Sequence, residues 1–92
     1  MLGEISVASV HAYALFDPGA THSFVSALFV EKCDGLRPEP LESCIGVATP
    51  DGKILVVKSI CRSCLISMEG WDLVAHLLVL SMTDFDVILG MD

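Results

Sequence analysis

Residues 14–24 of the chain read Ala14-Leu15-Phe16-Asp17-Pro18-Gly19-Ala20-Thr21-His22-Ser23-Phe24. An apolar run suited to the end of a strand is interrupted by Asp17-Pro18-Gly19-Ala20, a turn with proline at its second position and glycine at its third. Most such tetrapeptides are only turns. Here, however, the acidic residue ends an apolar strand, glycine lets the backbone approach it, and small hydroxyl-bearing residues follow. The pattern can therefore present a carboxylate from a rigid strand end, with backbone N–H groups to hold it ionised.

The segments before and after this stretch predict a second strand and a short helix. Apolar residues alternate over residues 4–9, which predicts a strand that meets the strand of residues 12–16 near Val10 and His11. The spacing of apolar residues between 23 and 33 instead fits a short helix.

The ends of this helix have candidate signals. Thr21 or Ser23 is suited to cap its start, and Gly35 stands where a helix would stop. Residues 38–40 hold two prolines and predict a loop.

The second half of the chain reads as hairpins. One pairs residues 43–49 with 53–59 across Pro50-Asp51-Gly52, and the other pairs 60–69 with 71–80 across Gly70. Residues 84–90 end the chain with an apolar run. The fold class is therefore mostly β with one short helix, in a closed barrel or sandwich.

Composition excludes several classes of protein. A chain of 92 residues that is 53% hydrophobic can bury enough apolar surface to fold as one small domain, so disorder is excluded. Its longest charge-free stretch, Pro18 to Val30, has 13 residues, whereas a membrane-spanning helix needs about 20. A formal charge of −7 without a basic cluster argues against nucleic acid as a partner. The apolar surplus instead favours oligomerisation.

The four cysteines are Cys33, Cys44, Cys61 and Cys64. The last two form a lone Cys-x-x-Cys without a second ligand pair of the kind that a zinc site needs. In a strand, residues three apart point to opposite faces. We therefore expect free, partly buried thiols, and a small metal or redox domain is the weakest alternative.

Three blocks of sequence carry a family resemblance. Residues 14–24 closely resemble the active-site segment of retropepsin-like aspartic proteases from gypsy-type LTR retrotransposons. Residues 47–53 resemble the flap hairpin of that family, and residues 84–92 resemble the strand before its C-terminal helix. The blocks occur in the family's order and span almost the whole chain. The resemblance implies that residues 1–92 form a single retropepsin-like protease domain, one half of an aspartic protease.

The resemblance also implies a mechanism and a set of site residues. An aspartic protease needs two carboxylates that share a proton, and this chain has one Asp-x-Gly-Ala motif. The implied enzyme is a homodimer in which each chain supplies Asp17 as the catalytic residue, without metal or cofactor. The implied active-site loop is Pro18, Gly19, Ala20 and Thr21, the flap that binds substrate is Thr49, Pro50, Asp51 and Gly52, and the loop support is Ile88, Leu89 and Gly90.

The implied substrate is an extended peptide or polyprotein that pairs with the flap through main-chain hydrogen bonds. Processing of a retroelement polyprotein places the enzyme in the cytoplasm or in retrotransposon virus-like particles. Neither nucleic acid nor membrane is an expected partner.

Two differences between this sequence and the family's pattern support a different function. The residue after the catalytic Asp is usually Ser or Thr, whose hydroxyl braces the loop across the dimer, whereas Pro18 has neither a hydroxyl nor an N–H. Relatives continue beyond Asp92 into a short helix, so we expect the C-terminal helix to be truncated. The alternative function is a catalytically silent dimerisation or peptide-binding domain.

A few other side chains have less specific signals. His22 is either close to the substrate or, more commonly for a histidine at a helix start, structural or solvated. Asp84 and Asp86 are either helpers of the site or, more commonly for charges that flank an apolar strand, solvated. Trp71 is expected in the core or at an interface.

Overall fold

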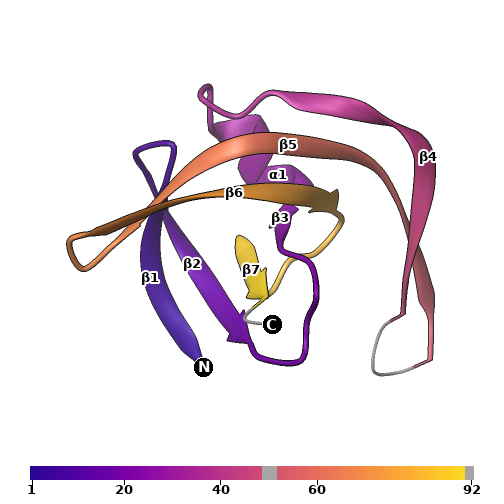
Figure 1. The fold of residues 1–92 in the computed structure, drawn as a ribbon, viewed down its shortest axis with the longest axis horizontal. Coiled ribbons are helices and arrows are strands. Elements are labelled where there is room, and N and C mark those ends of the chain that lie inside the picture. The colour runs from indigo at the N-terminus through magenta and orange to yellow at the C-terminus, as the bar shows by residue number, and fades with distance from the viewer. Residues whose placement is uncertain (49–51, 91–92) are drawn as a thin grey trace.

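The computed structural model describes residues 1–48 and 52–90. Seven strands and one helix follow one another in the order β1 (Leu2–Val7), β2 (Val10–Asp17), β3 (Phe24–Ser26), α1 (Ala27–Lys32), β4 (Pro38–Ala48), β5 (Ile54–Met68), β6 (Trp71–Leu80) and β7 (Val87–Gly90) (Figure 1). The predicted class, mostly β with one short helix, is confirmed. In the described part of the chain, no helix has the length and apolar character needed to cross a membrane.

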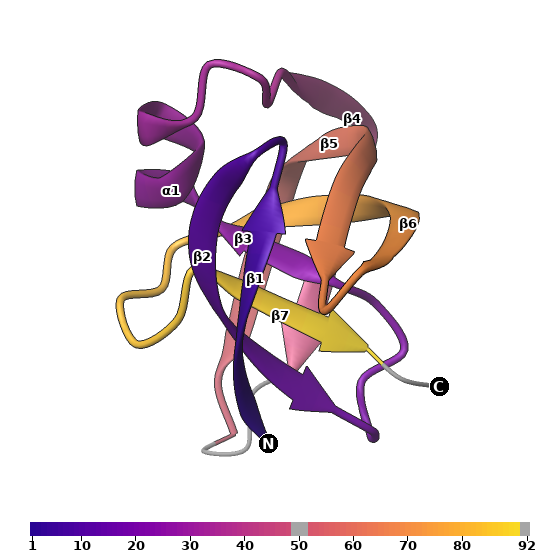
Figure 2. The same cartoon turned by 90° about the vertical axis from the view of Figure 1, so that its left-hand side faces the viewer.

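The strands form one strongly curved sheet in the order β1-β2-β7-β3-β6-β5-β4. The short strand β7 lies between β2 and β3, parallel to the first and antiparallel to the second. β1 also pairs with β5, but through two residue pairs alone, Ser6 with Ser67 and Val7 with Ile66. The sheet therefore curls back on itself without closing fully into the predicted barrel (Figure 2).

The N-terminal hairpin joins β1 and β2 through Ala8 and Ser9. Both have positive φ, at 49° and 69°, which suits the right-handed twist of a two-residue hairpin turn. The turn falls just before the predicted position near Val10 and His11. Alternation places Ile5 opposite Ala12, both buried, on the inner face.

The predicted helix over residues 23–33 is wrong in its first part. Residues Phe24–Ser26 form β3, whose side chains are all buried and whose backbone pairs with β6 and β7. Pairing on both sides of this short segment outweighs its local helical pattern. α1 starts only at Ala27, and its cap is Ser26, whose Oγ accepts a hydrogen bond from Phe29 N at 2.9 Å, rather than Thr21 or Ser23.

Gly35 has a role other than the predicted helix stop. The helix ends at Lys32, with Cys33 as its extended C-cap. A Cβ on Gly35 would lie 2.9 Å from the Cβ of Ala8. The absence of a side chain thus lets the segment after the helix pack against the β1–β2 turn.

The loop predicted at residues 38–40 is wrong as well, because this segment begins β4. Pro38 pairs with Cys61 and Pro40 with Ser59 in an antiparallel ladder. β4 is the edge strand of the sheet, so an N–H that points away from β5 has no neighbouring strand to bond. Proline at such a position loses no hydrogen bond of the sheet. Proline at an edge is therefore compatible with a strand.

The two predicted hairpins share one long strand. β5 runs through both, from Ile54 to Met68, with a register shift between Cys61 and Cys64. The turn to β6 uses Glu69 and Gly70, both with positive φ, at 47° and 84°. β4 and the first part of β5 form a hairpin that extends away from β1 and β2 (Figure 1).

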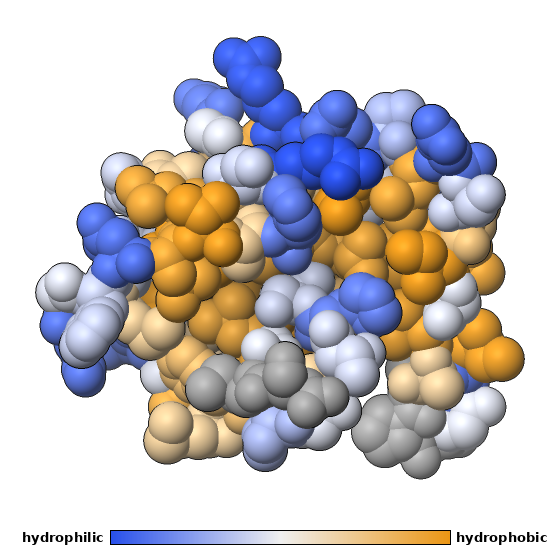
Figure 3. Space-filling view, viewed as in Figure 1, coloured by the Kyte–Doolittle hydropathy of each residue, from blue (hydrophilic) through white to orange (hydrophobic). Residues whose placement is uncertain are grey.

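Not all of the apolar surplus is buried. Figure 3 shows apolar surface toward the β5–β6 turn and over the β4–β5 hairpin. Trp71 is 75% exposed, so the core is wrong as its place, and its predicted place at an interface stays a prediction. The large apolar side chains left exposed are Met1, Leu2, Tyr13, Leu28, Ile54, Val56, Leu65, Trp71, Leu73 and Val74.

Candidate active site

Asp17 is the last residue of β2, and its carboxylate is held by the turn that follows. Gly19 N donates a hydrogen bond to Asp17 Oδ1 at 2.9 Å, and Ala20 N donates to Asp17 O at 3.2 Å. An aspartate that accepts from the backbone two residues on stabilises a turn of this kind. The side chain is half-buried, so its second oxygen can still meet a ligand.

β7 lies against this turn and supports it. Its Leu89 and Gly90 pair with Phe16 and Asp17, and Leu89 is buried in the core. A Cβ on Gly90 would lie 2.6 Å from Ala20 O and 2.7 Å from His22 O, so only glycine fits there.

The loop after Asp17 is also tied to β7 by a side chain. Gly90 N donates to Ser23 Oγ at 3.0 Å. Of the predicted loop-support residues, Gly90 lies directly against the predicted active-site loop, Leu89 pairs with Phe16 before the loop, and Ile88 lines the cleft described next.

A cleft of about 600 Å³ lies between the Asp17 turn and the β4–β5 hairpin. Its walls come from segments far apart in the sequence, which only the fold brings together. The lining residues are Asp17, Gly19, Ala20, Thr21, His22, Phe24, Ile45, Gly46, Val47, Ala48, Leu55, Leu80 and Ile88. A cleft whose described lining is mainly apolar, with Asp17 as its carboxylate, suits an extended peptide chain.

The predicted flap is described only in part. Thr49, Pro50 and Asp51 lie outside the described residues. Gly52 has a φ of +86°, which glycine adopts at little cost, as the turn pattern predicts. The strands that lead to and from this turn pair Ala48 with Ile54 and contribute to the cleft wall.

The remaining predicted loop residues differ in their positions. Pro18 is exposed, next to Asp17 but outside the cleft lining. Thr21 is exposed and lines the cleft, where its Oγ1 lies 3.1 Å from Nδ1 of His22. The structure therefore brings together Asp17, Gly19, Ala20 and Thr21, and it leaves Pro18 facing outward.

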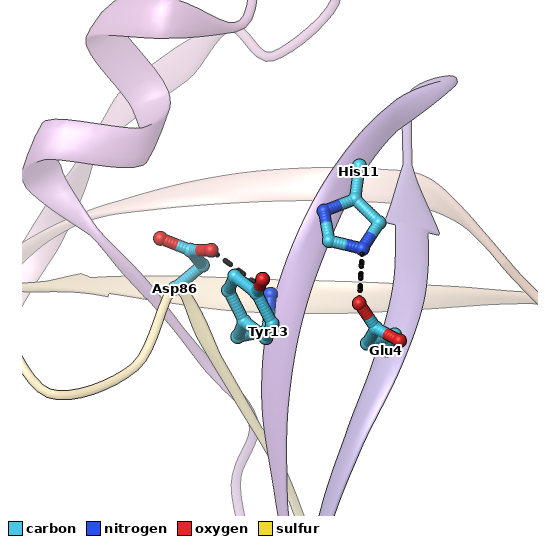
Figure 4. Close-up of polar contacts among 4 residues, drawn as sticks. All are labelled: Glu4, His11, Tyr13 and Asp86. Carbon is cyan, nitrogen blue, oxygen red and sulfur yellow. Dashed lines mark hydrogen bonds and ion pairs between the residues drawn. The ribbon is translucent and has the colours of Figure 1, made fainter.

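Sequence reasoning missed the role of Asp86. Its Oδ2 accepts from Tyr13 N at 2.9 Å, its backbone N donates to Tyr13 O, and its backbone O accepts from Ser26 N. Asp86 therefore joins β2 to β3 at the start of β7 (Figure 4). In the same view, His11 lies 3.0 Å from Glu4 Oε1 on the outer face of the hairpin, away from the cleft lining.

The cysteines are free thiols, and three of the four are buried. Cys61 and Cys64 both point inward, which contradicts the expectation of opposite faces, because the bulge at Ser63 adds a residue between them. Burial, with the neighbouring thiols, raises the pKa of Cys64 to about 11, and burial raises that of Cys61 as well. Within residues 1–48 and 52–90, no group of three or more potential ligands is arranged to hold a metal ion.

Comparison with known proteins gives a family and a fold. A family model described as retroviral aspartyl protease matches residues 1–92. No curated protein sequence matches the chain. Among solved structures, 124 chains match.

Two of these structures illustrate the likeness. The EIAV protease complexed with the inhibitor HBY-793 matches with a TM-score of 0.75 and 17% identity, over 98% of this chain and 80% of that one. The retroviral protease-like domain of Ddi1 from Leishmania major matches with a TM-score of 0.68 and 16% identity, over 100% of this chain and 68% of that one. At such identities the likeness shows the fold alone.

Proposed function

Because the chain belongs to the retroviral aspartyl protease family, we propose that it is an aspartic endopeptidase. Its substrate is the polyprotein of a gypsy-type LTR retrotransposon, and it acts in the cytoplasm or in virus-like particles of that element. Residues 1–92 constitute one retropepsin-like domain. The sequence resemblance of residues 14–24, 47–53 and 84–92 supports these finer assignments.

One observation carries the proposal. The Asp17 carboxylate stands at a strand end, oriented by Gly19 N, in a cleft whose opposite wall is the β4–β5 hairpin. A peptide laid in this cleft has apolar side chains around it and a carboxylate beside its backbone. The hairpin is in the right place to close over the peptide and exclude water.

Peptide hydrolysis by this chain requires a second copy. One carboxylate must be ionised to take a proton from water as the water oxygen attacks the peptide carbonyl carbon. The other must be protonated to donate to the carbonyl oxygen. The first carboxyl then gives the proton taken from water to the leaving nitrogen as the C–N bond breaks, and a hydroxyl of the tetrahedral intermediate returns a proton to the second carboxylate. A two-fold symmetric homodimer supplies Asp17 from each chain, without metal or cofactor.

Replacement of Asp17 tests the proposal. Asp17→Asn keeps nearly the same shape but cannot act as a base or share a proton. We expect cleavage of an unfolded protein at acidic pH to fall by at least about a hundredfold, the usual contribution of a general base, and the parent to be inhibited by pepstatin. Asp84→Asn is the matched control, because Asp84 is exposed and outside the cleft lining. Equal activity of Asp17→Asn and the parent would contradict the proposal.

A catalytically silent dimerisation or peptide-binding domain is the second candidate. The observation in its favour is Pro18, which is exposed and offers neither a hydroxyl nor an N–H to brace the loop. Peptide binding in the parent without cleavage at any pH would favour this candidate.

A further inference from the structure

The cleft has an unusual distribution of charge. Among the described residues that line it, Asp17 and His22 are the titratable side chains. The rest of this described lining is small, apolar or hydroxyl-bearing, without lysine or arginine. Within residues 1–48 and 52–90, His22 is thus the lining side chain that can present a positive charge to a bound peptide.

The position of His22 excludes a role at the start of the helix. α1 begins at Ala27 and is capped by Ser26, four residues after His22. His22 itself is exposed, at the end of the loop that begins with Asp17. Its side chain is therefore available to a ligand.

Thr21 restrains the imidazole ring of His22. Thr21 Oγ1 lies 3.1 Å from His22 Nδ1, and the two groups form a hydrogen bond. In the protonated ring, Nδ1–H donates to Thr21 Oγ1, and Nε2–H remains as a second donor. The protonated ring is therefore an oriented, charged donor.

We propose that His22 selects a carboxylate side chain in the bound peptide. The inference rests on the proposed function, because the cleft must hold a peptide. In a two-fold symmetric dimer, each chain contributes His22 at the same distance from the shared Asp17 pair. A glutamate or aspartate is therefore favoured at two positions, one on each side of the bond beside the Asp17 pair.

The net charge of the protein distinguishes this local preference from a general attraction of acidic peptides. Each chain carries a formal charge of −7, so the long-range field disfavours acidic peptides in general. A preference for glutamate at two symmetric positions would be opposite in sign to this general effect of the net charge. Within the described lining, His22 is the side chain whose positive charge accounts for such a local effect.

The test measures binding of uncleavable peptides, so that it does not depend on activity. In these peptides a reduced bond replaces the central amide, and Glu or Gln is placed at one position of the peptide at a time. The Kd of each peptide is measured at pH 5 by fluorescence anisotropy. We expect Glu to bind about fivefold more tightly than Gln at the two symmetric positions, the upper range for an exposed ion pair. His22→Gln abolishes this difference, and His22→Lys restores it.

The outcomes separate this inference from the proposed function. An unchanged Glu-to-Gln ratio in His22→Gln, or failure of all the peptides to bind the parent, overturns the inference. Loss of the ratio in His22→Gln supports it. If the parent shows the preference but does not cleave the corresponding ordinary peptides, the inference stands and the endopeptidase proposal fails.

Discussion

At the scale of single residues, local chemistry predicts the turn at Asp17 but not the long-range hydrogen bonds around it. The bond from Gly19 N to Asp17 Oδ1 joins residues two apart and follows from turn chemistry. Ser23 instead meets Gly90 N across 67 positions, and Asp86 meets Tyr13 N across 73. No local pattern encodes such pairs, because they form only once β7 lies between β2 and β3.

The buried cysteines are a second case of this kind. Strict alternation predicts opposite faces for Cys61 and Cys64, and one extra residue at Ser63, with a φ of +54°, reverses that result. A non-glycine residue in a bulge of this kind leaves no clear signal in the sequence. Their environment is therefore known from the structure alone.

Thiol reactivity should follow burial. At pH 8 a thiol with a pKa of about 11 is thiolate in about one molecule in a thousand, so Cys64 reacts slowly, and buried Cys33 and Cys61 are shielded too. We expect a thiol-reactive dye to label one site quickly, the exposed Cys44, and the other three only in denaturant. Cys44→Ser should lose the fast phase; a fast phase that persists in this variant would contradict the buried arrangement.

The same pKa has a consequence for stability. Because the pKa of Cys64 in the folded protein lies above its ordinary value of 9.0, the neutral thiol favours the folded state below pH 9. This contribution is lost as the pH rises towards about 11. Labelling at alkaline pH should therefore be done well below that value.

At the scale of elements, strands were easier to predict than boundaries. The hairpin strands have alternating apolar residues and clear turn signals, such as Gly70, and the structure confirms them. The start of α1 and the start of β4 were predicted wrongly. In both places, pairing with strands distant in sequence decides the outcome: β6 and β7 for residues 24–26, and β5 for Pro38 and Pro40.

The corrected helix start gives a prediction about stability. Ser26 is 2% exposed, and its Oγ accepts from Phe29 N. Ser26→Ala removes this cap, and we expect the free energy of unfolding to fall by about 1–2 kcal/mol, measured by urea denaturation. Thr21→Ala is the matched control, because Thr21 is one of the two caps that the sequence predicted, and it should change stability by less than about 0.5 kcal/mol. A larger loss in Thr21→Ala than in Ser26→Ala would place the cap elsewhere.

At the scale of the whole molecule, composition and architecture support the proposed dimer. The chain is 53% hydrophobic, and side chains as large as Met1, Leu2 and Trp71 remain mostly exposed after folding. In the described part of the chain, the cleft lining holds one carboxylate, that of Asp17. Both features are explained by the dimer of the proposed function, which buries apolar surface and completes the pair of carboxylates.

Replacement of Pro18 should show how strongly the chains associate. The family's hydroxyl at this position braces the loop across the two-fold axis, and each such hydrogen bond contributes about 1 kcal/mol. Symmetry doubles the effect, so Pro18→Ser should lower the Kd of the dimer by about tenfold or more, since about 1.4 kcal/mol corresponds to a factor of ten. Sedimentation equilibrium on the parent and the variant, side by side, measures the change.

Loss of proline also frees the unfolded chain, which lowers the stability of each folded chain by about 0.4–1 kcal/mol but does not weaken contacts between folded chains. Pro40→Ser controls for this effect, because Pro40 is also exposed but lies on β4, outside the cleft lining. Its dimer Kd should equal that of the parent. If Pro18→Ser also leaves the Kd unchanged or raises it, the loop must be braced within each chain. Ser23 is then the group to replace, because its Oγ already holds Gly90 N against the Asp17 turn.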